Sequence, residues 1–233
     1  MEHICIVKKG AILFRYDLIE PPMDWEVNYK SIEYSLNGLG KPKNLANYFF
    51  YFSNEDVVRK TANVAVKNTT KEKDGYWLTS AYVLRDLTLL NLCGNDTLCN
   101  LVNLYETGID VMTDEFSFYY NGVYKHFSEL KEPFEKFLNC DFFDIERKLA
   151  LRDTLVKPFE KYGFPFGLLG QTLTDCENGI AFAKLLADKG YDGYVFDESV
   201  GGHTVCLIND VVTGNSPALS KPEKRKVSTM EFL

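Results

Sequence analysis

The stretch from Gly190 to Ser199 constrains the fold of this chain more than any other segment. A helical pattern leads into it, with apolar residues at Ile180, Ala183, Leu186 and Ala187. The glycine at 190 stands where a helix ends, because glycine adopts the left-handed conformation without a side-chain penalty. Strands are predicted over 194–196 and, after a Gly-Gly turn, over 204–208. This order places two carboxylates at a sheet edge, although acids that merely cap a turn explain the segment at least as well.

The composition limits the classes of protein to which this chain can belong. Its 233 residues can bury a substantial core as one large domain or two small ones. A hydrophobic fraction of 45% and a charged fraction of 25% are typical of a soluble globular protein. The net charge of −7 argues against general nucleic-acid binding, which requires clustered Lys and Arg. An enzyme that holds an anionic cofactor through a few placed cations is compatible with this charge.

The cysteines predict reduced thiols in a cytoplasmic protein. The six are scattered, with no CxxC pair and no histidine at ligand spacing, so neither a disulfide framework nor a metal site is expected; they stand at 5, 93, 99, 140, 176 and 206. The first ten residues lack the apolar core of a signal peptide. No stretch approaches the 18 or so apolar residues that a membrane span needs, so no membrane association is expected.

The hydrophobic pattern predicts an α+β fold. Alternating or short apolar runs indicate strands over 4–7, 11–16, 48–52, 76–84 and 87–92. Helices are predicted over 29–36, from an N-cap near Ser53 through Ala65, and over 96–106. A further helix is expected to start at Thr174 or Asp175 and to lead into the glycine at 190.

The region from about 109 to 173 differs from its surroundings and is expected to be a helical insertion in a single domain of residues 1–215. A hairpin is predicted around Asn121-Gly122, a helix over 128–137 and a further pair of helices over 142–162. The region either shapes access to a substrate or serves as plain scaffold. The end of the chain, 216–233, is expected to be a loosely ordered tail.

Most standard catalytic signatures are absent from the sequence. It contains no phosphate-binding loop, dinucleotide fingerprint, zinc-protease helix or nucleophile elbow. The histidines at 3, 126 and 203 are far apart, so a metal site would have to be completed by carboxylates. A hydrolase that pairs Cys206 or Cys176 with His203 is conceivable, but no local pattern supports it.

Three separated segments remain, and together they resemble the ADP-ribosyltransferase-like family. The first is Phe14-Arg15-Tyr16-Asp17, the second Tyr51-Phe52-Ser53 leading into a helix, and the third the segment from Gly190 to Glu198. The resemblance extends over roughly 11–92 and 174–208 and leaves 109–173 uncovered. It implies a split, mixed or antiparallel sheet with flanking helices.

The resemblance also implies a reaction and residues that perform it. Cleavage of the nicotinamide–ribose bond of NAD passes through an oxocarbenium-like state, which a carboxylate such as Glu198 would stabilise. The implied catalytic residues are Glu198, Arg15 and Tyr51, and the implied cofactor-binding residues are Arg15, Tyr16, Tyr51, Ser53, Lys41 and Lys43. Arg15 would bind phosphate or ribose, Tyr51 would stack on nicotinamide, and the lysines would approach the pyrophosphate. Each also has a plainer interpretation. Arg15 would form a surface salt bridge, Tyr51 would be a core aromatic, Ser53 would cap a helix, and the two lysines would lie in a solvated loop.

The sequence leaves several alternatives open. Asp197 and Glu198 point to opposite faces if the strand continues, and Glu198 is chosen by residue type. An NAD hydrolase or phosphorylase toxin of the RES type is second, because that branch expects an acid in the helix where this chain has Ala62. A catalytically inactive member that acts as an interaction protein is third. The expected partners are NAD, a macromolecular acceptor (protein or nucleic acid) and, for a toxin, an inhibitor or antitoxin.

Overall fold

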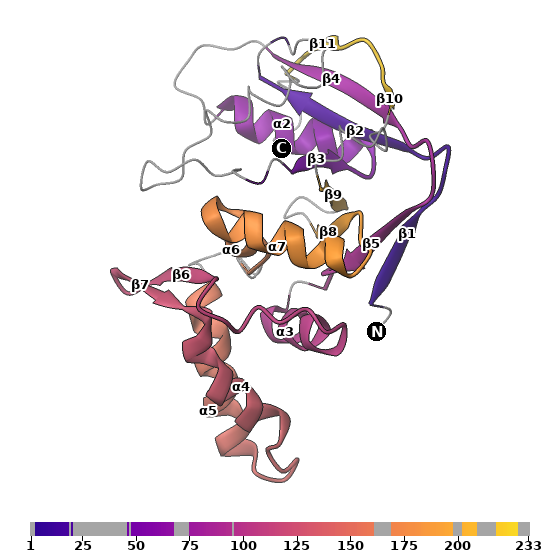
Figure 1. Ribbon diagram of the computed structural model, residues 1–233. Coiled ribbons are helices and arrows are strands. Elements are labelled where there is room, and N and C mark those ends of the chain that lie inside the picture. The colour runs from indigo at the N-terminus through magenta and orange to yellow at the C-terminus, as the bar shows by residue number, and fades with distance from the viewer. Residues whose placement is uncertain are drawn as a thin grey trace.

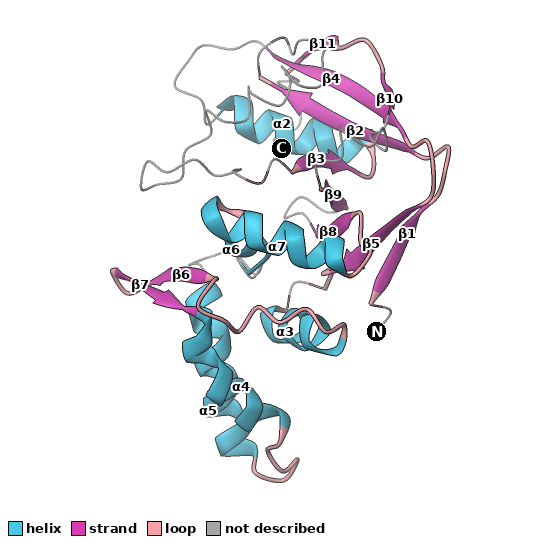
Figure 2. Cartoon of the chain, viewed as in Figure 1, coloured by secondary structure: helices cyan, strands magenta, loops and turns pink. Residues whose placement is uncertain are grey.

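The structure, a computed structural model, describes residues 3–18, 20, 46, 48–67, 75–94, 96–160, 169–197, 202–208 and 218–227. It confirms an α+β fold built on a mixed sheet (Figures 1 and 2). The strands are β1 Ile4–Val7, β2 Ile12–Asp17, β3 Phe49–Phe52, β4 Gly75–Tyr82, β5 Leu87–Asn91, β6 Ser117–Tyr120, β7 Val123–His126, β8 Gly193–Asp197, β9 His203–Leu207, β10 Ala218–Leu219 and β11 Glu223–Lys226. The helices are α2 Glu55–Lys67, α3 Thr97–Glu106, α4 Lys131–Leu138, α5 Ile145–Val156, α6 Leu169–Thr174 and α7 Cys176–Asp188, with short 3₁₀ turns η2 Phe127–Leu130 and η3 Lys157–Phe159. The helix expected over 29–36 lies outside the described residues.

The main sheet has the strand order β1-β5-β8-β9-β3-β2-β4-β10, and β11 also pairs with β4. The β5–β8 pair is parallel, and the other pairs are antiparallel. In Figure 1 the strands β2, β4 and β11 lie in the upper part of the molecule and β1, β5 and β8 lie lower, with β3 and β9 between them. None of the helices in the described part of the chain is both long and apolar enough to cross a bilayer.

A single bent ribbon of two antiparallel strands connects the two ends of this sheet. β1 pairs with β5 from Ile4↔Leu90 onward, and β2 pairs with β4 as far as Asp17↔Trp77. Four residues, 8–11, separate β1 from β2, and four residues, 83–86, separate β4 from β5, so the register is unbroken across the bend. The Gly10 N–H donates to the Val83 carbonyl at 2.8 Å within the bend. The β1–β5 pair and the β2–β4 pair, which lie toward opposite ends of the sheet, therefore follow one continuous register.

The two faces of the sheet bury different sets of side chains. Helices α2 and α7 pack on one face, against residues such as Phe52, Leu78 and Tyr194. Successive side chains along a strand point to opposite faces, so the residues that alternate with these on each strand point to the other side of the sheet. We call that side the Tyr51 face; its buried residues are Leu13, Phe49, Tyr51, Ala81, Val83, Leu87, Leu89, Val195, Val205 and Leu207.

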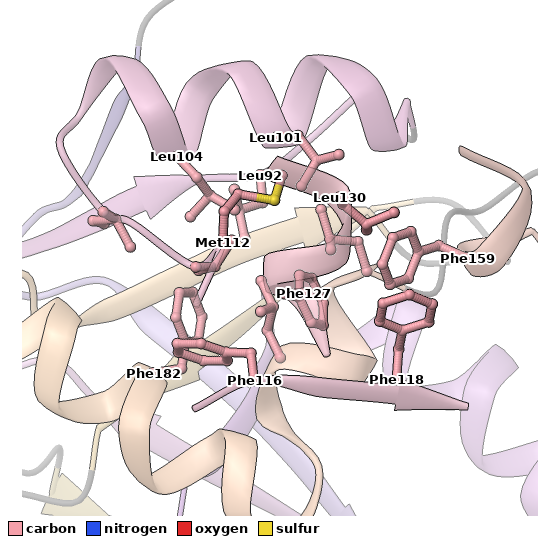
Figure 3. Packing of buried hydrophobic residues seen from close by; sticks show 14 of the residues in the cluster. Leu92, Leu101, Leu104, Met112, Phe116, Phe118, Phe127, Leu130, Phe159 and Phe182 are labelled. Atoms are coloured by element: carbon pink, nitrogen blue, oxygen red, sulfur yellow. The ribbon is translucent and has the colours of Figure 1, made fainter. Parts of the chain in front are cut away.

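The described residues of the 109–173 region, 109–160 and 169–173, pack into the largest core of the described chain. The hairpin predicted around Asn121-Gly122 is confirmed as β6–β7, and both turn residues have positive φ angles (52° and 86°). The helix predicted over 128–137 begins as η2 and continues as α4, whereas the predicted pair over 142–162 is one helix, α5, with a 3₁₀ turn. Figure 3 shows aromatic side chains of this region, among them Phe116 and Phe127, near Phe182 of α7. The region is thus part of the same core as the sheet.

The prediction of a loosely ordered tail is wrong for residues 218–227. Strands β10 and β11 pair with β4, with Ala218 opposite Tyr82 and Glu223 opposite Leu78. Between them, Ser220 accepts a hydrogen bond from the Ser80 N–H through its Oγ (2.9 Å) and donates its own N–H to the Ser80 carbonyl (2.8 Å). Without this segment β4 would present unpaired backbone groups at the sheet edge, which is why a charged, strand-poor sequence becomes ordered there.

The glycine at 190 ends α7 as the sequence predicts. Its φ angle is +77°, its N–H donates to the Ala187 carbonyl, and the Tyr191 N–H donates to the Leu186 carbonyl. These two bonds form a Schellman motif, which satisfies carbonyl groups at the end of the helix. The chain then turns at Asp192 and enters β8.

Asp192 fixes the start of β8 to the bend of the ribbon. Its carboxylate accepts from the Arg85 guanidinium, with Nη1 to Oδ2 at 3.0 Å, and from the Thr88 N–H at 2.8 Å. The Asp192 N–H also donates to the Thr88 carbonyl at 2.8 Å. The acid in the Tyr-Asp-Gly turn therefore has a structural role.

Asp192→Ala is expected to lower the free energy of unfolding by about 1–2 kcal/mol, because it removes charge-assisted hydrogen bonds that are partly screened by solvent. Asp192→Asn keeps an acceptor for the Thr88 N–H and should lose less. Urea denaturation of both variants beside the wild type measures the difference. Equal midpoints for all three proteins would show that Asp192 does not hold this junction.

Candidate functional site

Arg15 and Tyr51, two of the predicted site residues, lie side by side on neighbouring strands. The β2–β3 register sets Phe14 opposite Phe52, so Arg15 is opposite Tyr51 and both belong to the Tyr51 face. Arg15 is 5% exposed and Tyr51 is 0% exposed. Arg15 Nη2 donates to Asp17 Oδ1 at 2.8 Å. Both side chains are therefore buried, and neither forms part of an open surface.

The Tyr51 hydroxyl stays protonated at ordinary pH. Burial raises its pKa far above the ordinary value, and the negative charge of Asp17 acts in the same direction, whereas the positive charge of Arg15 opposes both. Because the ring has no exposed area, it offers no surface on which a nicotinamide could stack in this conformation. Tyr51 fits the plainer interpretation of a core aromatic.

Tyr16 lies on the face opposite to Arg15. Its ring centroid is 5.8 Å from that of Phe52 and 6.4 Å from that of Tyr76, within the cluster that packs under α2. Adjacent positions of a strand point to opposite faces, so Arg15 and Tyr16 cannot line the same side of the sheet. The structure does not bring Tyr16 together with the other predicted site residues.

Ser53 lies at the end of β3 beside the start of β9. Its N–H donates to the His203 carbonyl at 2.9 Å, and its Oγ accepts from the His203 N–H at 3.2 Å. Helix α2 is capped by the next residue, because Asn54 Oδ1 accepts from the Val57 N–H at 2.9 Å. Ser53 is thus a strand-end residue and not the helix cap.

Beside Ser53, three side chains meet at the ends of β5, β8 and β9. Asp197 Oδ1 is 2.7 Å from His203 Nδ1, and Cys93 Sγ is 3.6 Å from the same nitrogen. The other carboxylate oxygen, Oδ2, accepts from the Gly94 N–H at 2.7 Å. We call Ser53, Cys93, Asp197 and His203 the rim cluster. It lies two residues further along the strands from the row of Val195, Val205 and Tyr51, on the same face.

The electrostatics of the rim cluster keep its acid ionised and its thiol neutral. Burial alone would raise the pKa of Asp197, but hydrogen bonds from the Gly94 N–H, the Cys93 thiol and His203 lower that pKa below its ordinary value. Burial, with the charge of Asp197, raises the pKa of Cys93 to about 12. An unligated Cys93 is therefore not a thiolate nucleophile.

The cysteine–histidine pairs that the sequence leaves conceivable do not form in the part of the chain that the structure describes. Cys206 is fully buried, and burial raises the pKa of its thiol well above the ordinary value. The cysteine beside His203 is instead Cys93, which sequence reasoning misses as a site residue. Asn91, the last residue of β5, pairs with Val195 of the parallel strand β8. Cys93 and Asp197 each follow two residues later, so their contact is apparent only once this register is known. None of the six cysteines, all of which are described, forms a disulfide.

The three remaining predicted site residues, Glu198, Lys41 and Lys43, lie outside the described residues. Of the two adjacent acids, Asp197 is the one that the structure places, and it lies on the face of Arg15 and Tyr51. Arg15 and Asp197 are separated by three strand spacings, ~14 Å across a flat sheet, and ~7 Å along the strands.

No family model, no curated protein and no solved structure matches this chain.

Proposed function

We propose that this chain cleaves the nicotinamide–ribose bond of NAD and transfers ADP-ribose to a macromolecular acceptor. The observation that supports this most is that residues from three distant segments share one face of the sheet: Arg15 of β2, Tyr51 of β3 with Ser53 just after that strand, and Asp197 of β8. These are the segments on which the family resemblance depends. We propose a cytoplasmic location with it, which agrees with cysteines that form no disulfide in the described residues.

In this proposal the buried and the exposed residues have different roles. Arg15 and Tyr51 are too deeply buried to touch the ligand as they stand, so they fix the position of β3 beneath it. At the rim, Ser53 and the exposed His203 would contact the ribose, and Lys41 and Lys43 would approach the pyrophosphate, as the resemblance implies. The binding energy would come from charge-assisted and neutral hydrogen bonds to the sugar and phosphates.

The proposed acid is Glu198, which follows Asp197 directly in the chain. The Asp197 carboxylate already accepts from the Gly94 N–H and contacts both Cys93 and His203, so it has little capacity left for a ribose hydroxyl. A carboxylate near the anomeric carbon would stabilise the positive charge that develops as nicotinamide leaves. The carbon is then attacked by the acceptor or, in the hydrolase alternative, by water.

The test is nicotinamide release from NAD by the full chain, with and without a cell extract as a source of acceptors. Glu198→Gln is expected to lower the rate by about 100-fold or more, because it removes an electrostatic contact made mainly in the transition state. Glu177→Gln, which removes an exposed acid at the start of α7, should leave the rate unchanged. Label from the adenine end of NAD distinguishes transfer, which marks a macromolecule, from hydrolysis, which yields free ADP-ribose.

Two results would contradict this proposal. A wild-type protein that releases no nicotinamide under either condition is not an NAD-cleaving enzyme, and full activity in Glu198→Gln would remove that residue from the mechanism. Thermal unfolding with millimolar NAD separates a binding protein from a non-binder, because a ligand at 100 times its Kd stabilises the native state by about 2.7 kcal/mol. No shift in Tm would favour an interaction protein on the same scaffold.

A further inference from the structure

We propose that Cys93, Asp197 and His203 bind a divalent transition-metal ion, and that zinc is the ion that their donor atoms fit best. The side chains offer one sulfur, one oxygen and one nitrogen, and these ligand atoms all lie within 4.8 Å of one another. They come from the ends of three strands that are adjacent in the sheet, β5, β8 and β9. This inference does not depend on the reaction proposed above.

The distances match a tetrahedral site on the sulfur–nitrogen edge, whereas the nitrogen–oxygen edge is shorter than such a site requires. With Zn–S at ~2.3 Å and Zn–N at ~2.0–2.1 Å, a tetrahedral angle separates sulfur from nitrogen by ~3.6 Å. Cys93 Sγ and His203 Nδ1 are 3.6 Å apart. The corresponding nitrogen–oxygen edge is ~3.4 Å, whereas His203 Nδ1 and Asp197 Oδ1 are 2.7 Å apart, at hydrogen-bond distance. A small opening of this one contact would admit the ion.

The surroundings hold the ligands in place, as outer contacts do in metal sites. The Gly94 N–H binds Asp197 Oδ2 at 2.7 Å, which leaves Oδ1 directed at the histidine. The backbone of His203 is tied to Ser53 by hydrogen bonds in both directions, so the ring starts from a fixed strand. These contacts restrict the ligands before any ion arrives, which lowers the entropy lost on binding.

Charge and coordination number favour the same conclusion. A thiolate and a carboxylate neutralise a divalent cation, and a mixed thiolate–imidazole set favours zinc over magnesium or calcium. The described residues provide three protein ligands, which is the number found in zinc sites that keep a position open for water or substrate. The His203 side chain is 54% exposed, so an ion and a small oxygen ligand can reach the site from solvent.

The experiment is a titration of the chelator-treated full chain with Co²⁺, followed by displacement with Zn²⁺. We expect one ion per chain, with the visible absorption of tetrahedral cobalt and a sulfur-to-cobalt charge-transfer band in the near ultraviolet. Cys93→Ser should abolish the charge-transfer band, and His203→Asn should weaken affinity by about 100-fold or more, since loss of an outer contact alone costs 10–100-fold. Cys99→Ser and His126→Asn, which change the same residue types outside the cluster, should bind as the wild type does.

Absence of cobalt binding to the folded wild type, or wild-type binding by both Cys93→Ser and His203→Asn, would overturn the proposal. Circular dichroism confirms that each variant is folded, and the two variants remove different ligands, so failure of one to fold leaves the other as a test. No NAD is present in the titration. Nicotinamide release without metal binding would therefore contradict only the metal-site proposal. Metal binding without nicotinamide release would contradict only the proposed NAD reaction.

Discussion

Phe127→Ala is expected to lower the free energy of unfolding by about 3–5 kcal/mol, because it leaves a cavity in the largest core. The ring of Phe127 is 0% exposed, and its centroid lies 6.0 Å from that of Phe116 and 5.3 Å from those of Phe118 and Phe159 (Figure 3). These rings belong to the 109–173 region, yet the same buried cluster includes residues of the sheet such as Leu90 and Tyr194. Urea denaturation should therefore show one cooperative transition, shifted as a whole.

The matched control is Phe143→Ala. Phe143 is 87% exposed near the connection between α4 and α5, so its removal should change stability by less than about 0.5 kcal/mol. Two separate transitions in Phe127→Ala, with that of the sheet unshifted, would contradict a shared core. They would indicate an insertion that folds on its own.

Gly193→Ala is expected to destabilise the chain by about 3 kcal/mol or more, since it forces β8 away from β9. A Cβ atom added at Gly193 would lie 2.0 Å from the Cys206 carbonyl oxygen and 2.9 Å from the Leu207 Cα. Both contacts are with backbone, which cannot move aside as the end of a flexible side chain can. Because β8 and β9 also carry Asp197 and His203 of the rim cluster, the folded fraction of this variant should lose the contact between them as well.

Gly190→Ala is the comparison that separates crowding from backbone strain. A Cβ atom there meets nothing within 4 Å, so the cost comes only from the φ angle of +77°, about 1–2 kcal/mol. Thermal unfolding of both variants measures the difference. If Gly193→Ala were no less stable than Gly190→Ala, the close approach of β8 to β9 would be incorrect.

Features encoded by a few adjacent residues could be predicted from the sequence. Asn121-Gly122 between apolar runs gives the β6–β7 hairpin, and the glycine at 190 gives the end of α7, because each depends on local backbone conformation. The helix predicted over 96–106 is observed as α3, and it also starts from a local contact, since Asp96 Oδ1 accepts from the Leu98 N–H at 2.8 Å. The α+β class follows from the periodicity of these elements.

Features created by strand pairing could not be predicted in this way. Cys93 and His203 are 110 positions apart, and nothing near either of them signals the other. Their contact follows from the β5–β8–β9 order, which the hydrophobic pattern does not specify. The sequence does not predict β11 for a related reason. A Glu-Lys-Arg-Lys run has weak strand propensity, and β11 is stabilised by backbone pairing with the edge of β4.

The unbroken register of the bent ribbon limits how its sequence can change in length. A single residue inserted into 8–11 would slide β1 past β5 or β2 past β4, and side chains of the shifted strand would change faces. If β2 shifted, Arg15 would turn toward α2 and Phe14 would take its place beside Tyr51. Relatives of this chain should therefore vary here by two residues, by matched changes in 83–86, or through a bulge that absorbs the extra residue.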